Sequence, residues 1–144
     1  MYKKILVSTD GSKFAEKAEE HALFLAKISE AEIIALGVVE TGFAIGIPSD
    51  ETVFHIKEML RKEAEDNIRI IEKMKEKEHL DDVKIALRVD EGSPADVILD
   101  TIEKENIDLV VMGSSGKTGL DRFIMGSVAE KVVKAAKCSV LVVY

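Results

Sequence analysis

The sequence of 144 residues has only one cysteine, no excess of positive charge and no long apolar run. Without a second cysteine beside Cys138, no disulfide can form within the chain, which favours a reducing compartment. The apolar stretch near the N-terminus, Ile5 to Val7, is too short for the core of a signal peptide. No stretch approaches the ~20 apolar residues of a membrane span. We therefore expect a cytoplasmic protein with no membrane partner.

The charge balance also argues against nucleic acid. The formal net charge is −7, and an acidic surface repels phosphate backbones and anionic lipid. A nucleotide held locally by backbone N–H groups remains compatible with this charge. With 47% hydrophobic and 33% charged residues, the composition is typical of a globular protein, and we expect one domain over residues 1–144.

Apolar runs typical of strands alternate with stretches of helical periodicity. The last three helices are indicated in turn by an apolar stripe among dense charged residues, by Ser93-Pro94 and by Gly126-Ser127. This order predicts an α/β fold, a three-layer sandwich with a parallel sheet and helices on both faces. The expected strands are 4–8, 32–39, 83–89, 107–112 and 139–143, and the expected helices are 12–29, 51–77, one from 93 and one from 127.

The position of each strand in the sheet follows from its pattern of apolar and polar residues. Residues 83–89 alternate apolar and polar, as an edge strand with one wet face does, whereas the other runs are continuously apolar. A strand order of 3-2-1-4-5 satisfies these patterns. Ligands of such sheets bind outside the carboxyl ends of the strands, where the strand order reverses. Here that point lies between the first and fourth strands, after Ser8 and after Met112.

A glycine-containing segment follows the fourth strand. It reads GSSGKTGLDRFIMGS from Gly113 to Ser127 and includes Gly116 and Gly126. Ser127 and Glu130 form a capping-box pattern, so we expect a helix to begin at Ser127. Free N–H groups at a helix N-terminus attract phosphate, and the Ser127 hydroxyl can add a hydrogen bond. The alternative is that these glycines only mark turns.

The same segment does not form a Walker A loop. Gly116-Lys117-Thr118 matches the end of that motif, but the position of its first glycine is occupied by Val111 inside a strand. Lys117 lies either near the phosphates or in solvent.

Residues at the ends of the first and second strands complete the expected ligand site. Asp10 can hydrogen-bond a base or ribose, or else cap the first turn; Val38 can pack against a flat base. The three histidines have no ligand partner at a suitable spacing, and Ser114 and Ser115 have no histidine partner for hydrolysis.

With these motifs the chain resembles the universal stress protein family over nearly its whole length. The resemblance rests on LVSTDGS, on GSPADVILDTIEKENIDLVVMGSSGKTGL and on MGSVAEKVVKAAKCSVLVV. It implies an adenine nucleotide alpha hydrolase-like fold. The pattern G-x2-G-x9-G-[ST], formed by Gly113, Gly116, Gly126 and Ser127, marks the ATP-binding branch of that family.

The resemblance also implies a site and a dimer. Asp10 and Val38 would contact adenosine, and the glycines with Ser127 would surround the ribose and phosphates of ATP, AMP or ADP, with Mg²⁺ or Mn²⁺ held through the phosphates. The candidate nucleotide-binding residues are Ser8, Thr9, Asp10, Val38, Met112, Gly113, Gly116, Lys117, Gly126, Ser127 and Val128. A homodimer through Ser139–Val143 would cover an apolar edge strand.

Four functions are weighed. The first is a dimeric, nucleotide-dependent regulator or sensor in a stress response, with an unknown protein partner. The second is a slow ATPase acting as a switch, although no base is evident and only Arg122 could serve as an arginine finger. The third is an ATP pyrophosphatase, which needs paired glycines that Ser8–Ser12 lacks. The fourth is a scaffold without nucleotide, against which the intact glycine pattern argues.

Overall fold

Five parallel strands form one sheet in the computed structural model, which describes residues 1–42, 45–115 and 124–144. The sheet order is β3-β2-β1-β4-β5, which confirms the predicted topology. The elements are β1 Lys4–Ser8, α1 Lys13–Ser29, β2 Glu32–Val39, α2 Asp50–Ile68, α3 Ile70–Lys77, β3 Ile85–Glu91, α4 Pro94–Glu105, β4 Leu109–Gly113, α5 Ser127–Ala135 and β5 Ser139–Val143.

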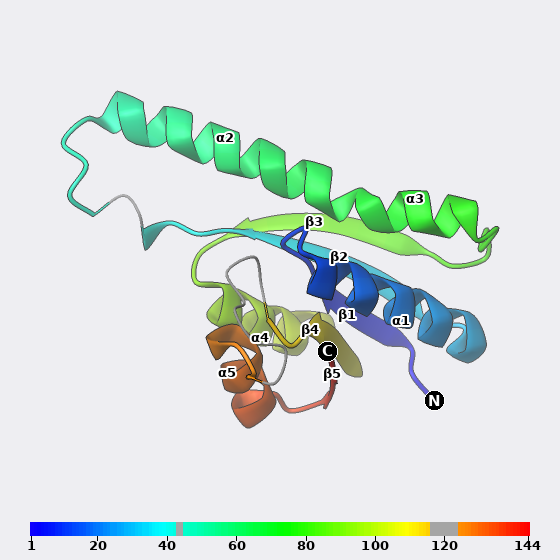
Figure 1. Ribbon diagram of the computed structural model, residues 1–144. Helices are drawn as coiled ribbons and strands as arrows, with labels where there is room; N and C mark the ends of the chain where they lie inside the picture. Colours follow the sequence, from blue (N-terminus) through cyan, green and yellow to red (C-terminus); the bar gives the residue numbers. More distant parts are fainter. Residues whose placement is uncertain (43–44, 116–123) are drawn as a thin grey trace.

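Two apolar clusters hold the helices on opposite faces of the sheet (Figure 1). Alternate residues of β1 supply them: Ile5 and Val7 pack in the cluster under α1 and α3, while Leu6 packs in the cluster under α4 and α5. The central strands are therefore buried on both faces, which is why their sequences are continuously apolar.

Local signals place most helix ends as expected. The Ser12 hydroxyl accepts from the Ala15 N–H at 3.2 Å and caps α1. Ser93 is the N-cap of α4 and Pro94 its first residue, as the sequence predicted. α1 and α4 both end at residues in the left-handed conformation, Glu30 and Asn106.

Three boundaries differ from the sequence-based expectation. The helix expected over residues 51–77 is divided at Arg69, because α2 packs mainly on β2 and β3 whereas α3 packs on α1. Residue 107 follows the C-cap of α4, where its N–H donates to the Ile102 carbonyl at 3.1 Å, and β4 begins at Leu109. The third strand covers Ile85–Glu91 instead of residues 83–89.

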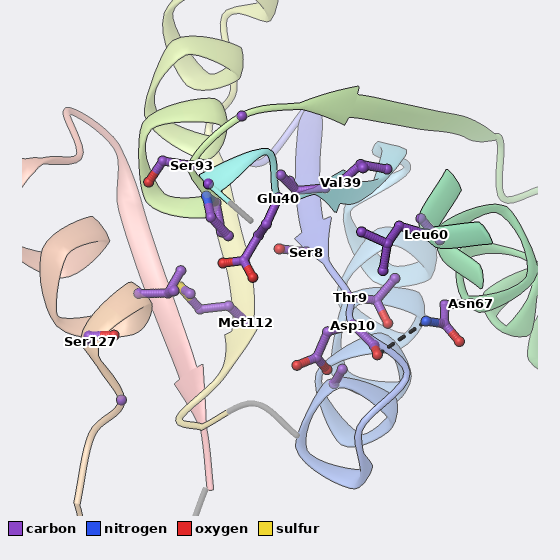
Figure 2. Close-up of a pocket in the computed structure, with 18 of the residues that line it drawn as sticks. Ser8, Thr9, Asp10, Val39, Glu40, Leu60, Asn67, Ser93, Met112 and Ser127 are labelled. Atoms are coloured by element: carbon purple, nitrogen blue, oxygen red, sulfur yellow. Dashed lines mark hydrogen bonds between the residues drawn. The ribbon is translucent and has the colours of Figure 1, made fainter. Parts of the chain in front are cut away.

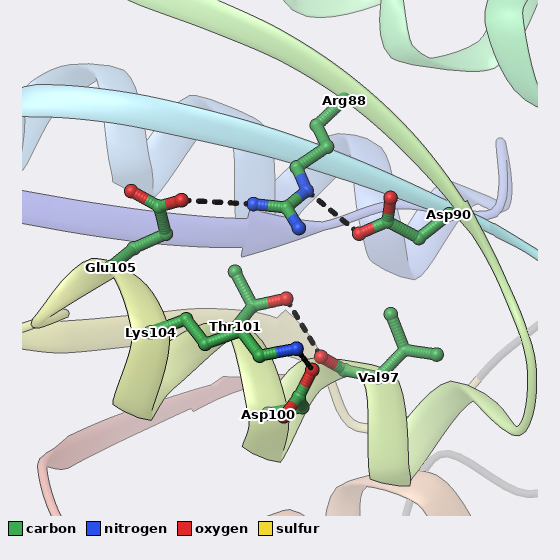
Figure 3. A network of polar contacts seen from close by, with 7 residues as sticks. All are labelled: Arg88, Asp90, Val97, Asp100, Thr101, Lys104 and Glu105. Atoms are coloured by element: carbon green, nitrogen blue, oxygen red, sulfur yellow. Dashed lines mark hydrogen bonds and ion pairs between the residues drawn. The ribbon is translucent and has the colours of Figure 1, made fainter.

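The edge strand β3 is tied to α4 by Arg88 (Figure 3). The Arg88 guanidinium donates to Asp90 at 2.7 Å and to Glu105 of α4 at 3.0 Å. Below this pair, the buried Thr101 hydroxyl donates to the Val97 carbonyl at 2.7 Å within α4. A charged side chain at an edge strand discourages pairing with another sheet, so β3 is the protected edge.

The burial of α1 allows a matched test. Leu23 is 3% exposed in the core cluster, while its neighbour Phe24 is 62% exposed. We expect Leu23→Ala to lower the free energy of unfolding by about 2–4 kcal/mol, because it leaves a cavity. We expect Phe24→Ala to change it by less than about 0.5 kcal/mol. Urea denaturation measures both, and equal effects would contradict the packing of α1.

Candidate functional site

A cleft of about 1510 Å³ opens between the described residues at the carboxyl ends of the strands. It lies where β1 and β4 pair side by side and their following helices leave toward opposite faces of the sheet. Figure 2 shows Thr9, Asp10 and Asn67 on one side of it and Ser93 and Ser127 on the other. This is the predicted switch point of the sheet.

The described lining includes nine of the eleven residues predicted for nucleotide binding. These are Ser8, Thr9, Asp10, Val38, Met112, Gly113, Gly126, Ser127 and Val128. The other two, Gly116 and Lys117, lie outside the described residues, as does Arg122. The topology therefore brings together side chains from four segments that are far apart in the sequence.

The turn after β1 is held by its own polar groups. The Thr9 N–H donates to the Leu36 carbonyl at 3.0 Å, and the Thr9 hydroxyl oxygen accepts from the Gly11 N–H at 3.3 Å. The Asp10 carboxylate accepts from the Ser12 N–H at 2.9 Å. Asp10 therefore stabilises the turn and also lines the cleft, so the two roles considered for it are compatible.

A side chain of α2 stabilises the same turn by a hydrogen bond to its backbone. Asn67 donates from Nδ2 to the Asp10 carbonyl at 3.1 Å. Gly11 has φ +78°, and a Cβ on it would collide with the Asn67 amide. Glycine is required here both by its backbone conformation and by this contact.

Gly113 ends β4, where its lack of a side chain serves packing. A Cβ at this position would lie 2.7 Å from the Phe14 Cβ and 2.9 Å from the Phe14 carbonyl carbon. The close approach of α1 to β4 thus demands glycine regardless of any ligand. Packing against Phe14 therefore explains this glycine, and Gly113 also lines the cleft.

α5 begins at Ser127 as expected, but the predicted capping box does not form. Gly126, not Ser127, is the N-cap, and no side chain caps the helix. Glu130 pairs instead with Lys134 at 2.6 Å, one turn further along. The Gly126 N–H donates to the Ser114 carbonyl at 2.6 Å, which fixes the entry of the chain into α5. As a result, the exposed Ser127 hydroxyl at the cleft has no capping role.

The second half of the cleft wall was not predicted from the sequence. The helix α2 contributes Ile56, Leu60, Glu63, Ala64 and Asn67 to the lining. In the sequence these residues belong to a charged amphipathic helix whose apolar stripe was assigned to the core. Only Ala64 and Ile68 of α2 are buried, because the first half of the helix extends past the sheet (Figure 1).

The charged side chains in the described lining are all acidic: Asp10, Glu40 and Glu63. The Glu40 carboxylate points into the cleft between Ser8 and Met112 (Figure 2). Among the described residues, no group of three or more His, Cys, Asp or Glu side chains is placed to hold a metal ion. Nor does any described helix have the length and apolar character to cross a membrane.

One acidic residue lies behind the cleft. Glu19 of α1 is fully buried. Burial raises the pKa of its carboxyl from 4.5 to about 7; the nearby Thr9 hydroxyl lowers it in part, and the charges of Glu16 and Asp10 raise it further. Within the described part of the chain, neither carboxyl oxygen has a hydrogen-bond partner of good geometry.

Comparison with known proteins gives a consistent result. The model of the universal stress protein family matches residues 1–144. Universal stress protein MJ0531 of Methanocaldococcus jannaschii is 43% identical over 143 residues, which cover 99% of this chain and 82% of that protein.

Solved structures share the fold. The structure of MJ0577 from the same organism is 35% identical, with a TM-score of 0.84 and coverage of 99% of this chain and 96% of that one. A universal stress protein from Archaeoglobus fulgidus in complex with dAMP is 23% identical, with a TM-score of 0.62 and coverage of 99% and 98%.

The buried carboxyl predicts how stability depends on pH. Between about pH 4.5 and about pH 7 the folded chain keeps the Glu19 proton that the unfolded chain has lost. The free energy of unfolding therefore falls as pH rises through this window, by on the order of 2–4 kcal/mol from this group. We expect Glu19→Gln to remove this decline, as measured by urea denaturation across the window.

The exposed neighbour Glu20 provides the control. Glu20→Gln should keep the pH dependence of the wild-type chain. If Glu19→Gln and Glu20→Gln gave the same pH profile, the carboxyl of Glu19 would not be the group responsible.

Proposed function

The chain belongs to the universal stress protein family, and we propose that it binds an adenine nucleotide, ATP in particular, in the cleft between β1 and β4. The observation that carries the proposal is the start of α5. There the N-terminus of a helix and the hydroxyl of Ser127, which does not cap that helix, border a large cleft at the switch point of the sheet. Such a terminus offers N–H donors and a positive dipole end to phosphate.

The described walls suit the remaining parts of a nucleotide. Val38 and Met112 supply apolar surface for a base, and Asp10 supplies an acceptor for ribose hydroxyls. A structure of the same fold contains dAMP, an adenine nucleotide. Because the described lining is acidic, the phosphates would bring their own Mg²⁺ or Mn²⁺, which lowers their repulsion from Asp10, Glu40 and Glu63.

Binding, and not catalysis, is the function proposed. Phosphoryl transfer requires cationic groups positioned on the transferring phosphate, and the lining that the structure describes contains no Lys, Arg or His. A nucleotide-occupied state that is read by a partner protein agrees with a regulator or sensor in a stress response.

We expect ATP–Mg²⁺ to bind the stripped protein, and adenine nucleotide to be released when the freshly purified protein is denatured. Gly126→Val should abolish binding, since Gly126 lines the cleft and a Cβ there would already lie 3.3 Å from the Ser114 carbonyl oxygen. Ser127→Ala should weaken binding by roughly tenfold, the loss of a hydrogen bond to a charged group. Calorimetric titration measures both.

Ser29→Ala is the matched control, because Ser29 lies at the end of α1 and does not line the cleft. Unchanged affinity in Gly126→Val, or equal losses in Ser127→Ala and Ser29→Ala, would contradict the location of the site.

We also propose a homodimer through β5. Among the described strands it pairs with β4 alone, which leaves its other edge without a strand partner there, and its residues Val140, Leu141 and Val142 are half-buried. Val142 belongs to neither core cluster. An apolar edge strand left uncovered promotes aggregation, and pairing with a second copy would cover it.

The dimer is tested by light scattering at micromolar concentration. The wild-type chain should show twice the chain mass of 15.9 kDa, and Val142→Lys should shift it toward the monomer. Met59→Lys is the control, since Met59 is 71% exposed on α2 at the opposite side of the sheet. A monomeric wild-type protein would exclude the proposed interface.

A further inference from the structure

The first half of α2 carries apolar side chains that are not part of the core. Ile56 and Leu60 are half-buried and line the cleft, and they belong to neither core cluster of the described residues. Further along the same helix, Ala64 and Ile68 are buried. The apolar stripe of α2 therefore continues from the sheet onto the wall of the cleft, where its side chains are only partly covered.

Gly37 of β2 allows α2 to lie close to the sheet. A Cβ on Gly37 would be 3.0 Å from the Ile68 Cγ2 and 3.4 Å from the Ala64 Cβ. A side chain at this position would press against the helix, so glycine favours the close approach. The preceding turn of α2 then extends past the end of β2 (Figure 1), and Leu60 and Val39 both line the cleft.

The end of β3 holds the same part of α2. The Arg61 guanidinium donates to the Glu91 carboxylate at 2.9 Å, and the Lys57 Nζ lies 3.7 Å from that carboxylate. These groups are partly exposed, so the pairs add little stability, but they favour one rotation of the helix about its axis. Ile56 and Leu60 lie on the adjoining face, since successive residues of a helix are about 100° apart. That face is the one that lines the cleft.

The end of the cleft that suits an anion lies across from α2. Figure 2 shows Met112 and Ser127 on one side and Leu60 with Asn67 on the other, with Ser8 between them. Ser127 stands at the start of α5, where N–H donors favour phosphate. A ligand that spans the cleft therefore meets polar donors at one end and apolar side chains at the other.

We propose that Ile56 and Leu60 are specificity-determining residues of the nucleotide site, which cover one face of the base while the phosphates lie at the start of α5. This inference rests on the proposed nucleotide binding, and it assigns the direction of the nucleotide in the cleft. A base has two apolar faces and is bound best between two apolar surfaces. Val38 and Met112 supply one surface, and α2 supplies the second.

The reverse direction, with the phosphates at α2, is disfavoured by charge. Glu63 lines the cleft one turn after Leu60 on the same face of the helix, and a carboxylate there repels phosphate oxygens. The cations Lys57 and Arg61 pair with Glu91 and are absent from the lining that the structure describes. This wall therefore suits the uncharged end of a nucleotide.

The test replaces leucine by asparagine, which has nearly the same shape and lacks the apolar surface. We expect Leu60→Asn to raise the dissociation constant for ATP–Mg²⁺ by roughly tenfold, because the base would lose apolar contact area. Leu60→Met keeps the volume and the apolar character, and its affinity should equal that of the wild type. Calorimetric titration measures all three proteins.

Met59→Asn is the matched control, because Met59 adjoins Leu60 on α2, is 71% exposed and does not line the cleft. It introduces the same poor helix former and should leave the affinity unchanged. Equal losses in Leu60→Asn and Met59→Asn, or no loss in Leu60→Asn, would overturn the inference and leave nucleotide binding itself intact.

NMR spectra of the wild-type protein separate this inference from the proposed function. An aromatic ring shifts the proton resonances of methyl groups that pack on its face, so ATP–Mg²⁺ should move the Ile56 and Leu60 methyl resonances upfield. Adenosine, which has no phosphate, should do the same at higher concentration. If ATP–Mg²⁺ binds by calorimetry and these methyl resonances stay in place, the base lies elsewhere and the inference is refuted.

The remaining outcomes also decide between the two proposals. If ATP–Mg²⁺ does not bind but adenosine moves the Ile56 and Leu60 methyl resonances, the proposed function fails and the apolar base site on α2 stands. If ATP–Mg²⁺ does not bind and adenosine leaves these resonances unchanged, both proposals fail.

Discussion

The parallel pairing of β1 with β4 is the constraint on which the site depends. Ile5, Leu6 and Val7 pair with Leu109, Val110 and Val111, and the chain then leaves β1 toward α1 on one face and β4 toward α5 on the other. Because the two following helices lie on opposite faces, the cleft opens at the ends of these strands in the part of the chain that the structure describes. The two apolar clusters bury β1 and β4 on both faces, and the residues that line the cleft follow the ends of these strands.

Residues at the cleft serve packing and binding together. Gly113 is required by the approach of Phe14, Gly11 by the contact with Asn67, and Asp10 by the turn that it stabilises. Substitutions at these positions therefore affect the fold as well as any ligand. Ser127 differs, because it is exposed, borders the cleft and caps nothing. Glu19 differs in the opposite sense, since it does not line the cleft and its buried carboxyl oxygens have no hydrogen-bond partner among the described residues.

Sequence patterns were sufficient for the sheet order and for most of the wall formed by strand ends, because apolar runs and cap residues act locally. They failed where tertiary packing determines helix boundaries and the surroundings of side chains. The division of the long helix at Arg69 has no proline or glycine to mark it, and the capping box at Ser127 was displaced because Gly126 bonds to Ser114. The α2 wall and the burial of Glu19 depend on how a helix extends over the sheet, which periodicity alone does not specify.

The central claim is that one ligand contacts the turn after β1 and the start of α5 at the same time. Hydrogen–deuterium exchange, followed by mass spectrometry with and without ATP–Mg²⁺, tests it most directly. The account predicts slower exchange in both segments, residues 9–12 and 126–130, with little change at α3, which does not line the cleft. Protection confined to one segment, or located around α3, would contradict a nucleotide bound between β1 and β4.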